Sequence, residues 1–210
     1  MPPDESDYLR KKPQQSRSRA VVTAILEAAD QLLTRVGDPE KVSLEGVARR
    51  AGIGIGSLYD YFSNREDVLG AFLSRLTDAN FVELEKQVNA TNAVSFDEAL
   101  PLIVDATMQL YLAHPDRTRA TIAAIARLGW MRPVVTERDR FAGVLAARLR
   151  VSFPELDPEK VQLTTEVLCD SVIGVVGGEL WRTRTAEQHE RVRAEVVSMV
   201  KAAVQRLRST

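Results

Sequence analysis

The chain has little cysteine, little histidine and no long uninterrupted apolar run. Its single cysteine, Cys169, excludes a disulfide framework within the chain and suits a reducing compartment. No apolar run approaches the roughly 20 residues that a membrane-spanning helix requires, and the N-terminus has no apolar signal segment. These absences predict a cytoplasmic protein without a membrane partner.

The sequence also lacks the motifs of common enzyme classes. His114 and His189 lie far apart, and neither has the spacing of a metal ligand from a cysteine or from the other histidine. There is no Gly-x-Ser-x-Gly elbow and no dinucleotide fingerprint. Gly52, Gly54 and Gly56 form a glycine-rich turn, but no strand precedes it, which argues against a phosphate loop. We expect no catalytic residues, no metal and no cofactor; a small helical enzyme is the weaker alternative.

Composition indicates a folded chain whose positive charge is local. The 210 residues are 45% hydrophobic and 27% charged, which describes a globular protein with a substantial core. The net charge of −1 provides no overall field that would attract nucleic acid. Positive residues gather at Arg10, Lys11, Lys12, Arg17 and Arg19, with no acidic residue between Arg10 and Arg19. This cluster is suited to phosphate contacts, and a solvated tail is the alternative, weaker for Arg17 and Arg19.

Apolar residues recur at helical spacing, and no strand-like alternation persists, so we predict an all-α fold of about nine helices. The first helix should span about residues 17–36 and end at Gly37, which a proline soon follows. Ser63 with Glu66 forms a capping-box pattern that opens a long helix reaching about Val88. Later helices are expected at about 96–113, 116–128, 132–150, 158–182 and 186–208.

Two short helices are predicted between residues 43 and 62. Ser43 can cap a helix from Leu44 to Arg50, and Gly52 suits the positive φ at which such a helix stops. A second short helix can begin near Gly54. Two short helices joined by a tight turn with glycine indicate a helix-turn-helix, whose second helix enters the DNA major groove. An ordinary helical corner in a core has the same spacing.

The residues of this stretch carry a family resemblance. They are Val47-Ala48, Ala51-Gly52-Ile53, Gly56-Ser57-Leu58-Tyr59, Tyr61-Phe62 and Arg65-Glu66, preceded in the first helix by Ile25, Ala28-Ala29, Leu32-Leu33 and Gly37. With them, residues 17–70 resemble the helix-turn-helix of the TetR family of bacterial transcriptional regulators. Residues 1–15, which are polar with three prolines, predict a flexible basic arm. The resemblance implies a three-helix DNA-binding domain at 16–66 and a larger effector-binding and dimerisation domain at 67–210.

The resemblance also implies which residues meet double-stranded operator DNA. Gly56 would let the recognition helix approach closely, and the hydroxyls of Ser57 and Tyr59 suit base or phosphate contacts. Leu58 and Phe62 are expected in the core. The full expected set is Arg17, Arg19, Ser43, Gly54, Ile55, Gly56, Ser57, Tyr59, Tyr61 and Arg65.

Three residues depart from the family pattern. Gly54 removes a side-chain helix cap, and Ile55 cannot hydrogen-bond a base, although it can contact a thymine methyl. Asp60 places negative charge on the recognition helix, where it can accept from cytosine or pair with Arg65. The operator sequence therefore stays open. The alternative function is a helical small-molecule or protein-binding module with weakened DNA binding.

The last two predicted helices are apolar enough to require burial in the chain or against a partner. The resemblance implies that they form a two-fold homodimer interface, so that two recognition helices read a palindromic operator. Gly174 and Gly178 would permit close helix approach. The expected interface residues are Val167, Ser171, Gly174, Gly178, Val196 and Val200.

The resemblance further implies a pocket for a small-molecule effector of unknown identity. The candidates are the large adaptable side chains of the second half and one polar residue, namely Met108, Tyr111, Trp130, Met131, Phe141, Asp170 and Trp181. Each is more often plain core, and a buried Asp170 would need either a ligand or a protein partner. Cys169 is expected to be a small buried hydrophobe. The sequence thus predicts a homodimeric repressor released by an apolar or amphipathic effector, with the sign of regulation taken from the resemblance alone.

Overall fold

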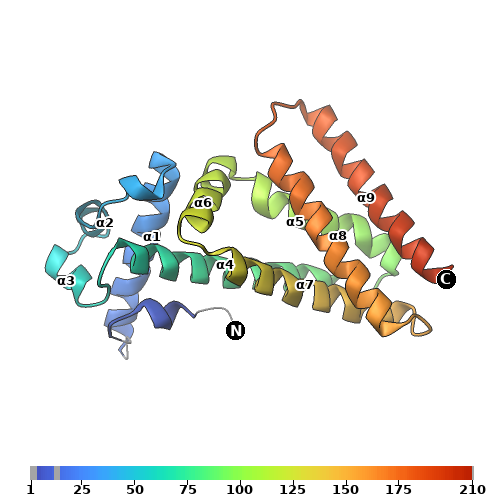
Figure 1. Ribbon diagram of the computed structural model, residues 1–210, viewed down its shortest axis with the longest axis horizontal. Coiled ribbons are helices and arrows are strands. Elements are labelled where there is room, and N and C mark those ends of the chain that lie inside the picture. Colours follow the sequence, from blue (N-terminus) through green and yellow to red (C-terminus); the bar gives the residue numbers. More distant parts are fainter. Residues whose placement is uncertain (1–3, 12–14, 210) are drawn as a thin grey trace. The chain divides into compact units, whose positions relative to one another are not determined.

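The computed structural model describes residues 4–11 and 15–209, and within these ranges all regular structure is helical (Figure 1). The described residues form the α-helices α1 Ser16–Val36, α2 Leu44–Arg50, α3 Ile55–Tyr59, α4 Arg65–Ala90, α5 Phe96–Leu112, α6 Pro115–Arg127, α7 Met131–Ser152, α8 Pro158–Glu179 and α9 Ala186–Arg208, with short 3₁₀ helices η1 Glu5–Tyr8 and η2 Pro39–Lys41. The predicted all-α class is confirmed, and the predicted helix bounds agree to within three residues.

The chain divides into two compact units. Unit 1 comprises the described residues up to Ala79 together with His114–Val135, and unit 2 comprises Asn80–Ala113 and the described residues from Thr136 onward. Helices α4 and α7 each contribute residues to both units. This division differs from the expected boundary after residue 66, because α6 and the first half of α4 belong to the compact body that contains α1.

In unit 1, α1 packs against α2 and α6, and α2 contacts α3 (Figure 1). The buried face of α1 carries Val22, Ile25, Leu26 and Leu33, whose spacing is that of one side of a helix. Leu58 from α3 and Phe62 after it are completely buried in the same core. The expectation that both are core residues is confirmed.

The predicted caps and ends of the first helices are present. Gly37 ends α1 with φ +69°, and its N–H donates to the Leu33 carbonyl. The Ser43 hydroxyl caps α2, since it accepts from the Gly46 N–H at 3.1 Å. Gly52 has φ +71° in the turn, and Gly54 precedes α3 without a side-chain cap, as expected.

The predicted capping box at the start of α4 is wrong by one residue. The Asn64 Oδ1 accepts from the Asp67 N–H at 2.7 Å, and the Asp67 carboxylate accepts from the Ser63 N–H at 3.2 Å. Asn64 therefore caps the helix in place of Ser63. Both side chains are good caps, so the sequence pattern did not distinguish them.

In unit 2, α5, α8 and α9 pack on one another around a core of aliphatic side chains. By length and composition α8 is apolar enough to cross a membrane, contrary to the expectation that no segment is. One face of α8 nevertheless packs into this core through Val161, Val172 and Val176. The core helix of a globular protein has the same composition, so this property does not distinguish the two environments.

Candidate DNA interface and apolar cavity

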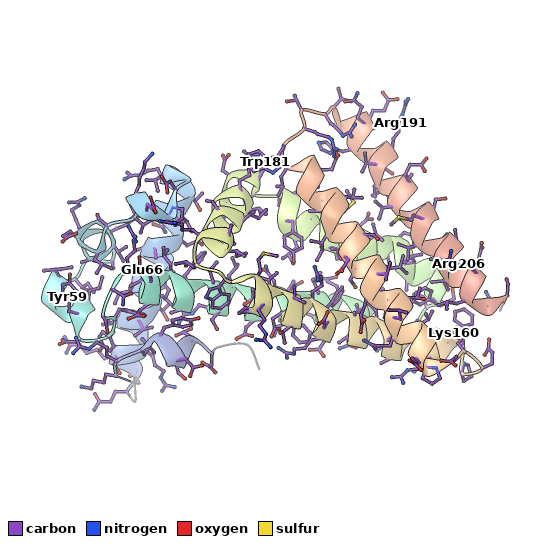
Figure 2. The ribbon with its side chains drawn as sticks, in the orientation of Figure 1. Tyr59, Glu66, Lys160, Trp181, Arg191 and Arg206 are labelled. Atoms are coloured by element: carbon purple, nitrogen blue, oxygen red, sulfur yellow. The ribbon has the colours of Figure 1, made fainter. Side chains whose placement is uncertain are left out.

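The first turn of α3 is exposed. Ile55 and Tyr59 keep 37% and 42% of their surface accessible, and Figure 2 shows Tyr59 on this short helix. Gly54, Gly56 and Ser57 are also exposed, and a Cβ added at either glycine would meet no atom within 4 Å. Leu58 holds the helix to the core from its opposite side. The helix therefore presents a surface without steric obstruction, which another molecule can approach closely.

Other predicted DNA contacts lie on the surface of the same unit. Arg17 and Arg19 are exposed in the first turns of α1 and form no ion pair within the described residues. Ser43 is exposed at the start of α2, and because its oxygen accepts the capping bond, its hydroxyl hydrogen is available to an outside acceptor. Tyr61 is only half-buried and packs against the core of unit 1. The structure thus brings these groups into one unit with α3.

Arg65 already has partners within the protein. Its guanidinium donates to the Glu40 carbonyl oxygen at 2.8 Å and pairs with the Glu66 carboxylate at 2.8 Å. The Glu40 carboxylate pairs in turn with Arg127 of α6. Arg65 therefore links the start of α4 to η2. Its ion pair is with Glu66 and not, as the sequence suggested, with Asp60. A phosphate would have to share the Arg65 guanidinium with these groups.

The N-terminal segment, expected as a flexible arm, packs on the rest of unit 1 over residues 4–11. Glu5 forms a two-pronged ion pair with Arg75 of α4, at 2.7 and 3.0 Å. Tyr8 packs against Trp130, with ring centroids 6.0 Å apart and the ring planes tilted by 32°. Arg10 is bound to the backbone at the end of α3. Lys12 of the predicted basic cluster lies outside the described residues.

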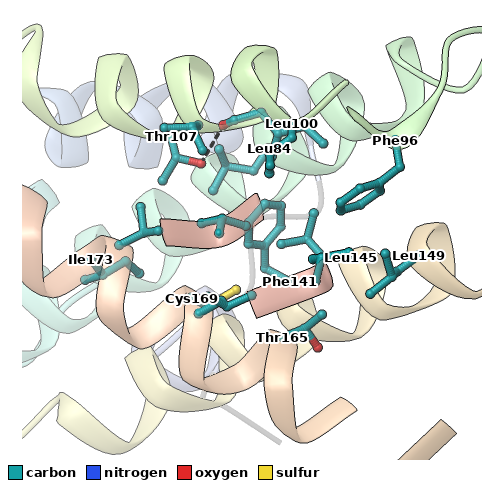
Figure 3. A pocket seen from close by; sticks show the side chains of 16 residues that line it. Leu84, Phe96, Leu100, Thr107, Phe141, Leu145, Leu149, Thr165, Cys169 and Ile173 are labelled. Carbon is teal, nitrogen blue, oxygen red and sulfur yellow. Dashed lines mark hydrogen bonds between the residues drawn. The ribbon is translucent and has the colours of Figure 1, made fainter. Parts of the chain in front are cut away.

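Unit 2 contains an apolar cavity of about 70 Å³. Sixteen residues from α4, α5, α7, α8 and α9 line it, and none of them is charged (Figure 3). One wall is the face of α5 that carries Leu100, Ile103, Val104 and Thr107. Such a space accommodates apolar groups and offers little to a polar one.

Of the predicted pocket residues, Phe141 lines this cavity. Met108 and Tyr111 pack in the neighbouring core without lining it. Trp130 is buried in the core of unit 1, so it is not part of the wall. Met131 and Trp181 are 54% and 71% exposed. Choosing pocket residues by their size and aromaticity therefore identified one residue of the cavity wall. The helical spacing of the apolar residues on α5 would have indicated one whole side of it.

The two unusual residues on α8 have simple explanations. Asp170 is exposed rather than buried, and its carboxylate pairs with Arg138 of α7 at 2.5 Å. Cys169 is buried beside the cavity, which confirms it as a small buried hydrophobe. Burial, reinforced by the neighbouring Asp170 charge, raises the pKa of the Cys169 thiol to about 12. The thiol is therefore uncharged at neutral pH.

The predicted dimer residues fall into two groups. Val167 and Gly174 are exposed on α8, and Ser171 and Gly178 are half-buried there. Val196 and Val200 of α9 are instead buried in the core of their own chain, because they form the inner side of the predicted apolar stripe. This placement corrects their assignment to a partner-facing surface. A surface groove beside α9 is lined by Val175, Val192 and Met199 together with charged residues.

Two buried charged residues were not singled out from the sequence. Glu179, at the end of α8, pairs with Arg184 at 2.7 Å, Arg182 at 3.2 Å and His189 at 3.4 Å. An acidic residue at a helix C-terminus opposes the helix dipole, and this mismatch was the available signal. Arg148 of α7 donates to the carbonyl oxygens of two residues after α4, Thr91 and Val94, at 3.3 and 2.6 Å. Within the described ranges no cluster of three or more His, Cys, Asp or Glu side chains has the geometry to hold a metal ion.

Comparisons with known proteins match both halves of the chain. Residues 25–72 match the family described as bacterial regulatory proteins of the tetR family, and residues 95–202 match the tetracyclin repressor-like C-terminal domain. No curated protein matches the chain.

Solved structures share the fold at low identity. A putative TetR-family transcriptional regulator from Mesorhizobium loti is 17% identical, with 92% of this chain and 97% of that chain covered and a TM-score of 0.71. A putative transcriptional regulator from Pseudomonas aeruginosa is 18% identical, with 94% and 96% covered and a TM-score of 0.65. The fatty acid degradation regulator FadR from Bacillus halodurans is 20% identical, with 93% and 96% covered and a TM-score of 0.60. Because the C-terminal family model alone spans more than half of the chain and the N-terminal model covers the helix-turn-helix, the protein belongs to the TetR family of DNA-binding transcriptional regulators.

Proposed function

We propose that the protein is a one-component transcriptional repressor that binds a palindromic operator as a homodimer and is released by a small-molecule effector. The exposed first turn of α3 carries this proposal, because Gly54, Gly56 and Ser57 leave its backbone open to a close ligand surface. The major groove of DNA admits an α-helix and would be such a close ligand surface. The sign of regulation follows from the family resemblance. We also propose that the protein acts in the cytoplasm, where its DNA target lies, and that it has neither a membrane partner nor a catalytic activity.

Dimerisation is proposed because α3 is short. A five-residue helix reaches few base pairs, and a two-fold dimer doubles the sequence that is read. Large apolar side chains are exposed on the last two helices, among them Leu163 and Val167 of α8 and Met199 of α9. A second copy that covers these side chains would remove apolar surface from water. We assign the interface to the outer faces of α8 and α9.

A second candidate keeps the fold but weakens the DNA interaction. Ile55 and Asp60 are both exposed on or beside α3, one without hydrogen-bonding capacity and the other negatively charged. Both features lower the affinity of a helix for phosphates and base edges. A sensor or protein-binding module of the same fold would have such a surface.

A binding experiment with the full chain separates these candidates. We would measure fluorescence anisotropy with DNA segments taken from beside the protein's own gene, at several salt concentrations. Specific binding of a palindromic segment by a dimer is the expected result, and its loss in Gly56→Leu would locate the contact at α3. Thermal melting of the Gly56→Leu protein checks the fold. Binding of every segment with equal affinity, or of none, would favour the sensor candidate.

A further inference from the structure

The cavity of unit 2 restricts the chemistry of what it can bind. Among its sixteen lining residues, Thr107, Thr165 and Cys169 are the ones that carry a heteroatom in the side chain. Figure 3 shows Thr107, Thr165 and Cys169 among the aliphatic and aromatic side chains. A polar ligand group would therefore depend on these three side chains for hydrogen bonds.

The two threonine hydroxyls are already used as donors. Thr107 Oγ1 donates to the Ile103 carbonyl oxygen at 2.9 Å, within its own helix. Thr165 Oγ1 donates in the same way to the carbonyls of Val161 and Gln162, at 3.1 and 2.8 Å. A hydroxyl has one hydrogen, so neither threonine offers a donor to the cavity. The thiol of Cys169 is a weak donor.

Nearby charges do not compensate for this lack. Arg138 of α7 acts electrostatically on Cys169, but its guanidinium is paired with Asp170 at 2.5 Å. A carboxylate in the cavity would lose its water without gaining a donor or an unpaired cation, and an ammonium group would find no anion in the wall. Both kinds of charge are excluded by the same wall.

We propose that the effector is an uncharged, hydrocarbon-like molecule, with neither a carboxylate nor an ammonium group. This inference rests on the proposed effector site and names its ligand class. The cavity volume of about 70 Å³ is roughly half of the ~150 Å³ of an engineered apolar cavity that binds benzene. A larger effector must therefore push lining side chains apart. This displacement would make the effector-bound conformation differ from the effector-free one. Release of an operator requires such a difference, because an effector with equal affinity for both conformations shifts nothing.

The test compares ligands that share a carbon skeleton and differ in charge. We would titrate the full-length protein with 1-hexanol, hexanoate and hexylamine at neutral pH, using calorimetry and thermal shift. Hexanol should bind at least about 100-fold more tightly than either ion, since a buried unpaired charge is strongly unfavourable. Equal or tighter binding of hexanoate would overturn the proposal. Binding of none of the three would also overturn it, because the space would then be ordinary core.

Matched variants locate the ligand. Leu100 and Leu102 lie on the same helix, one 4% exposed at the cavity and the other 56% exposed at the surface. Leu100→Phe should weaken hexanol binding at least about tenfold by filling the space, whereas Leu102→Phe should leave it unchanged. If Leu100→Phe does not fold, labelling of Cys169 in the unaltered protein gives a second measurement. Bound hexanol should slow that labelling, and an unchanged rate would place the ligand elsewhere.

Operator release is measured separately, so the two proposals fail separately. Hexanol that binds but leaves operator affinity unchanged would refute effector control while the ligand class stands. Hexanoate that releases the operator would refute the ligand class while effector control stands.

A second inference comes from the N-terminal segment and concerns how α3 is held. The Arg10 N–H donates to the Tyr61 carbonyl at 2.9 Å, and its guanidinium donates to the Tyr59 carbonyl at 3.0 Å. The last carbonyls of a helix lack partners within the helix and carry the negative end of its dipole. A cation at this position stabilises the end of the recognition helix.

The segment is anchored away from Arg10 by its side chains. The ring of Tyr8 lies so close to Gly70 of α4 that a Cβ at this position would overlap it. Trp130 packs against the same ring, and Glu5 pairs with Arg75. Gly70 therefore provides the space in which the segment sits. The three contacts hold residues 5–10 against α4 and Trp130 within unit 1.

We infer that residues 4–11 form a brace that positions α3, with Arg10 as a positioning residue rather than a phosphate ligand. Salt dependence separates the two roles, since each lost phosphate contact lowers the salt slope by about one. Arg10→Ala should weaken operator binding about fivefold with an unchanged slope, whereas Arg17→Ala should reduce the slope by about one. A reduced salt slope in Arg10→Ala would identify Arg10 as a phosphate ligand. An unchanged operator affinity would show that Arg10 has no role in DNA binding.

Displacing the anchor tests the brace without touching Arg10. Gly70→Ala should displace Tyr8 and accelerate amide exchange in α3 of the DNA-free protein, whereas Gly143→Ala, where a Cβ meets no atom within 4 Å, should not. Tyr8→Ala should act like Gly70→Ala, because it removes the ring that packs against Trp130. Unchanged exchange in Gly70→Ala and Tyr8→Ala would refute the brace. This readout needs no operator, so it stands whether or not the proposed DNA binding does.

Discussion

The two compact units differ in what they bury. In unit 1 the core side chains around α3, such as Ile25, Leu58 and Phe62, are completely enclosed. Among the described residues of unit 1, Ser74 is the one buried residue with a polar side chain. Unit 2 encloses an apolar cavity and also buries the charged residues Glu137, Arg148 and Glu179. Tight packing suits a unit that presents a short helix in a fixed geometry. Spare volume would suit the proposed effector-binding role of unit 2, since side chains next to open space can shift.

The largest expected effect comes from the core of unit 1. Phe62→Ala should lower the free energy of unfolding by about 4 kcal/mol, because the fully packed site cannot collapse around the lost ring. Leu145→Ala, at the wall of the cavity, should cost only about 2 kcal/mol, the low end of the range, since its side chain already borders open space. Urea unfolding measures both losses. Equal losses would contradict the difference in packing.

Buried charge in unit 2 should give the next largest effect. Glu179→Ala removes a carboxylate that is 1% exposed and leaves two arginines without their partner, so we expect a loss of about 3 kcal/mol. The control is Glu187→Ala, whose ion pair with Arg191 is 75% exposed at the carboxylate and should contribute under about 1 kcal/mol. Thermal unfolding of the two variants makes the comparison. Similar losses would mean that burial does not strengthen the Glu179 cluster.

High pH should affect unit 2 through Cys169. Its folded-state pKa of about 12 lies above the ordinary value of 9.0, so its contribution to stability is complete below pH 9 and is lost as the pH rises towards 12. Cys169→Ala should flatten the fall in stability over this window, as measured by urea unfolding at successive pH values. Tyr111 also has a raised pKa through burial, so part of the fall should persist. An identical pH profile in the variant would show that the thiol does not titrate with unfolding.

The smallest effect should be the same in both units, because helix caps act locally. Ser43 caps α2 in unit 1, and Ser95 forms a capping box with Glu98 at the start of α5 in unit 2. Ser43→Ala and Ser95→Ala should each cost about 1 kcal/mol. Calorimetric melting of the two proteins provides the measurement. A much larger loss for either would mean that its cap also carries tertiary contacts.

Local signals in the sequence predicted local structure well. Gly37 and Gly52 marked backbone with positive φ, and Ser43 and Gly54 marked the starts of α2 and α3, because these features depend on residues within one turn. The sequence predicted Ser63 as the cap of α4, whereas Asn64 caps it, because two residues that are both good caps are adjacent. The family resemblance was carried by this same locally determined stretch.

Features that depend on distant residues were not predictable in this way. The stripe containing Val196 and Val200 was correctly identified as apolar, but one helix has no property that tells an inner face from a partner-facing one. Trp130 was expected at a ligand pocket and lies instead against Tyr8 in unit 1. The partners of Arg10 stand 49 and 51 positions away in the chain.

The sequence by itself determined the all-α class and the order and bounds of the helices, since these follow from apolar periodicity and from caps within a few residues. It also determined the helix-turn-helix, through the family resemblance of residues 17–70 rather than through spacing. Only the tertiary structure decided that Arg10 bonds the backbone at the end of α3 and that α8 and α9 bury one face of their apolar side chains in their own unit. It also decided that uncharged, mostly apolar residues of five helices line the cavity. These outcomes depend on which faces meet when the helices pack. Periodicity specifies that a face is apolar, and only packing specifies what covers it.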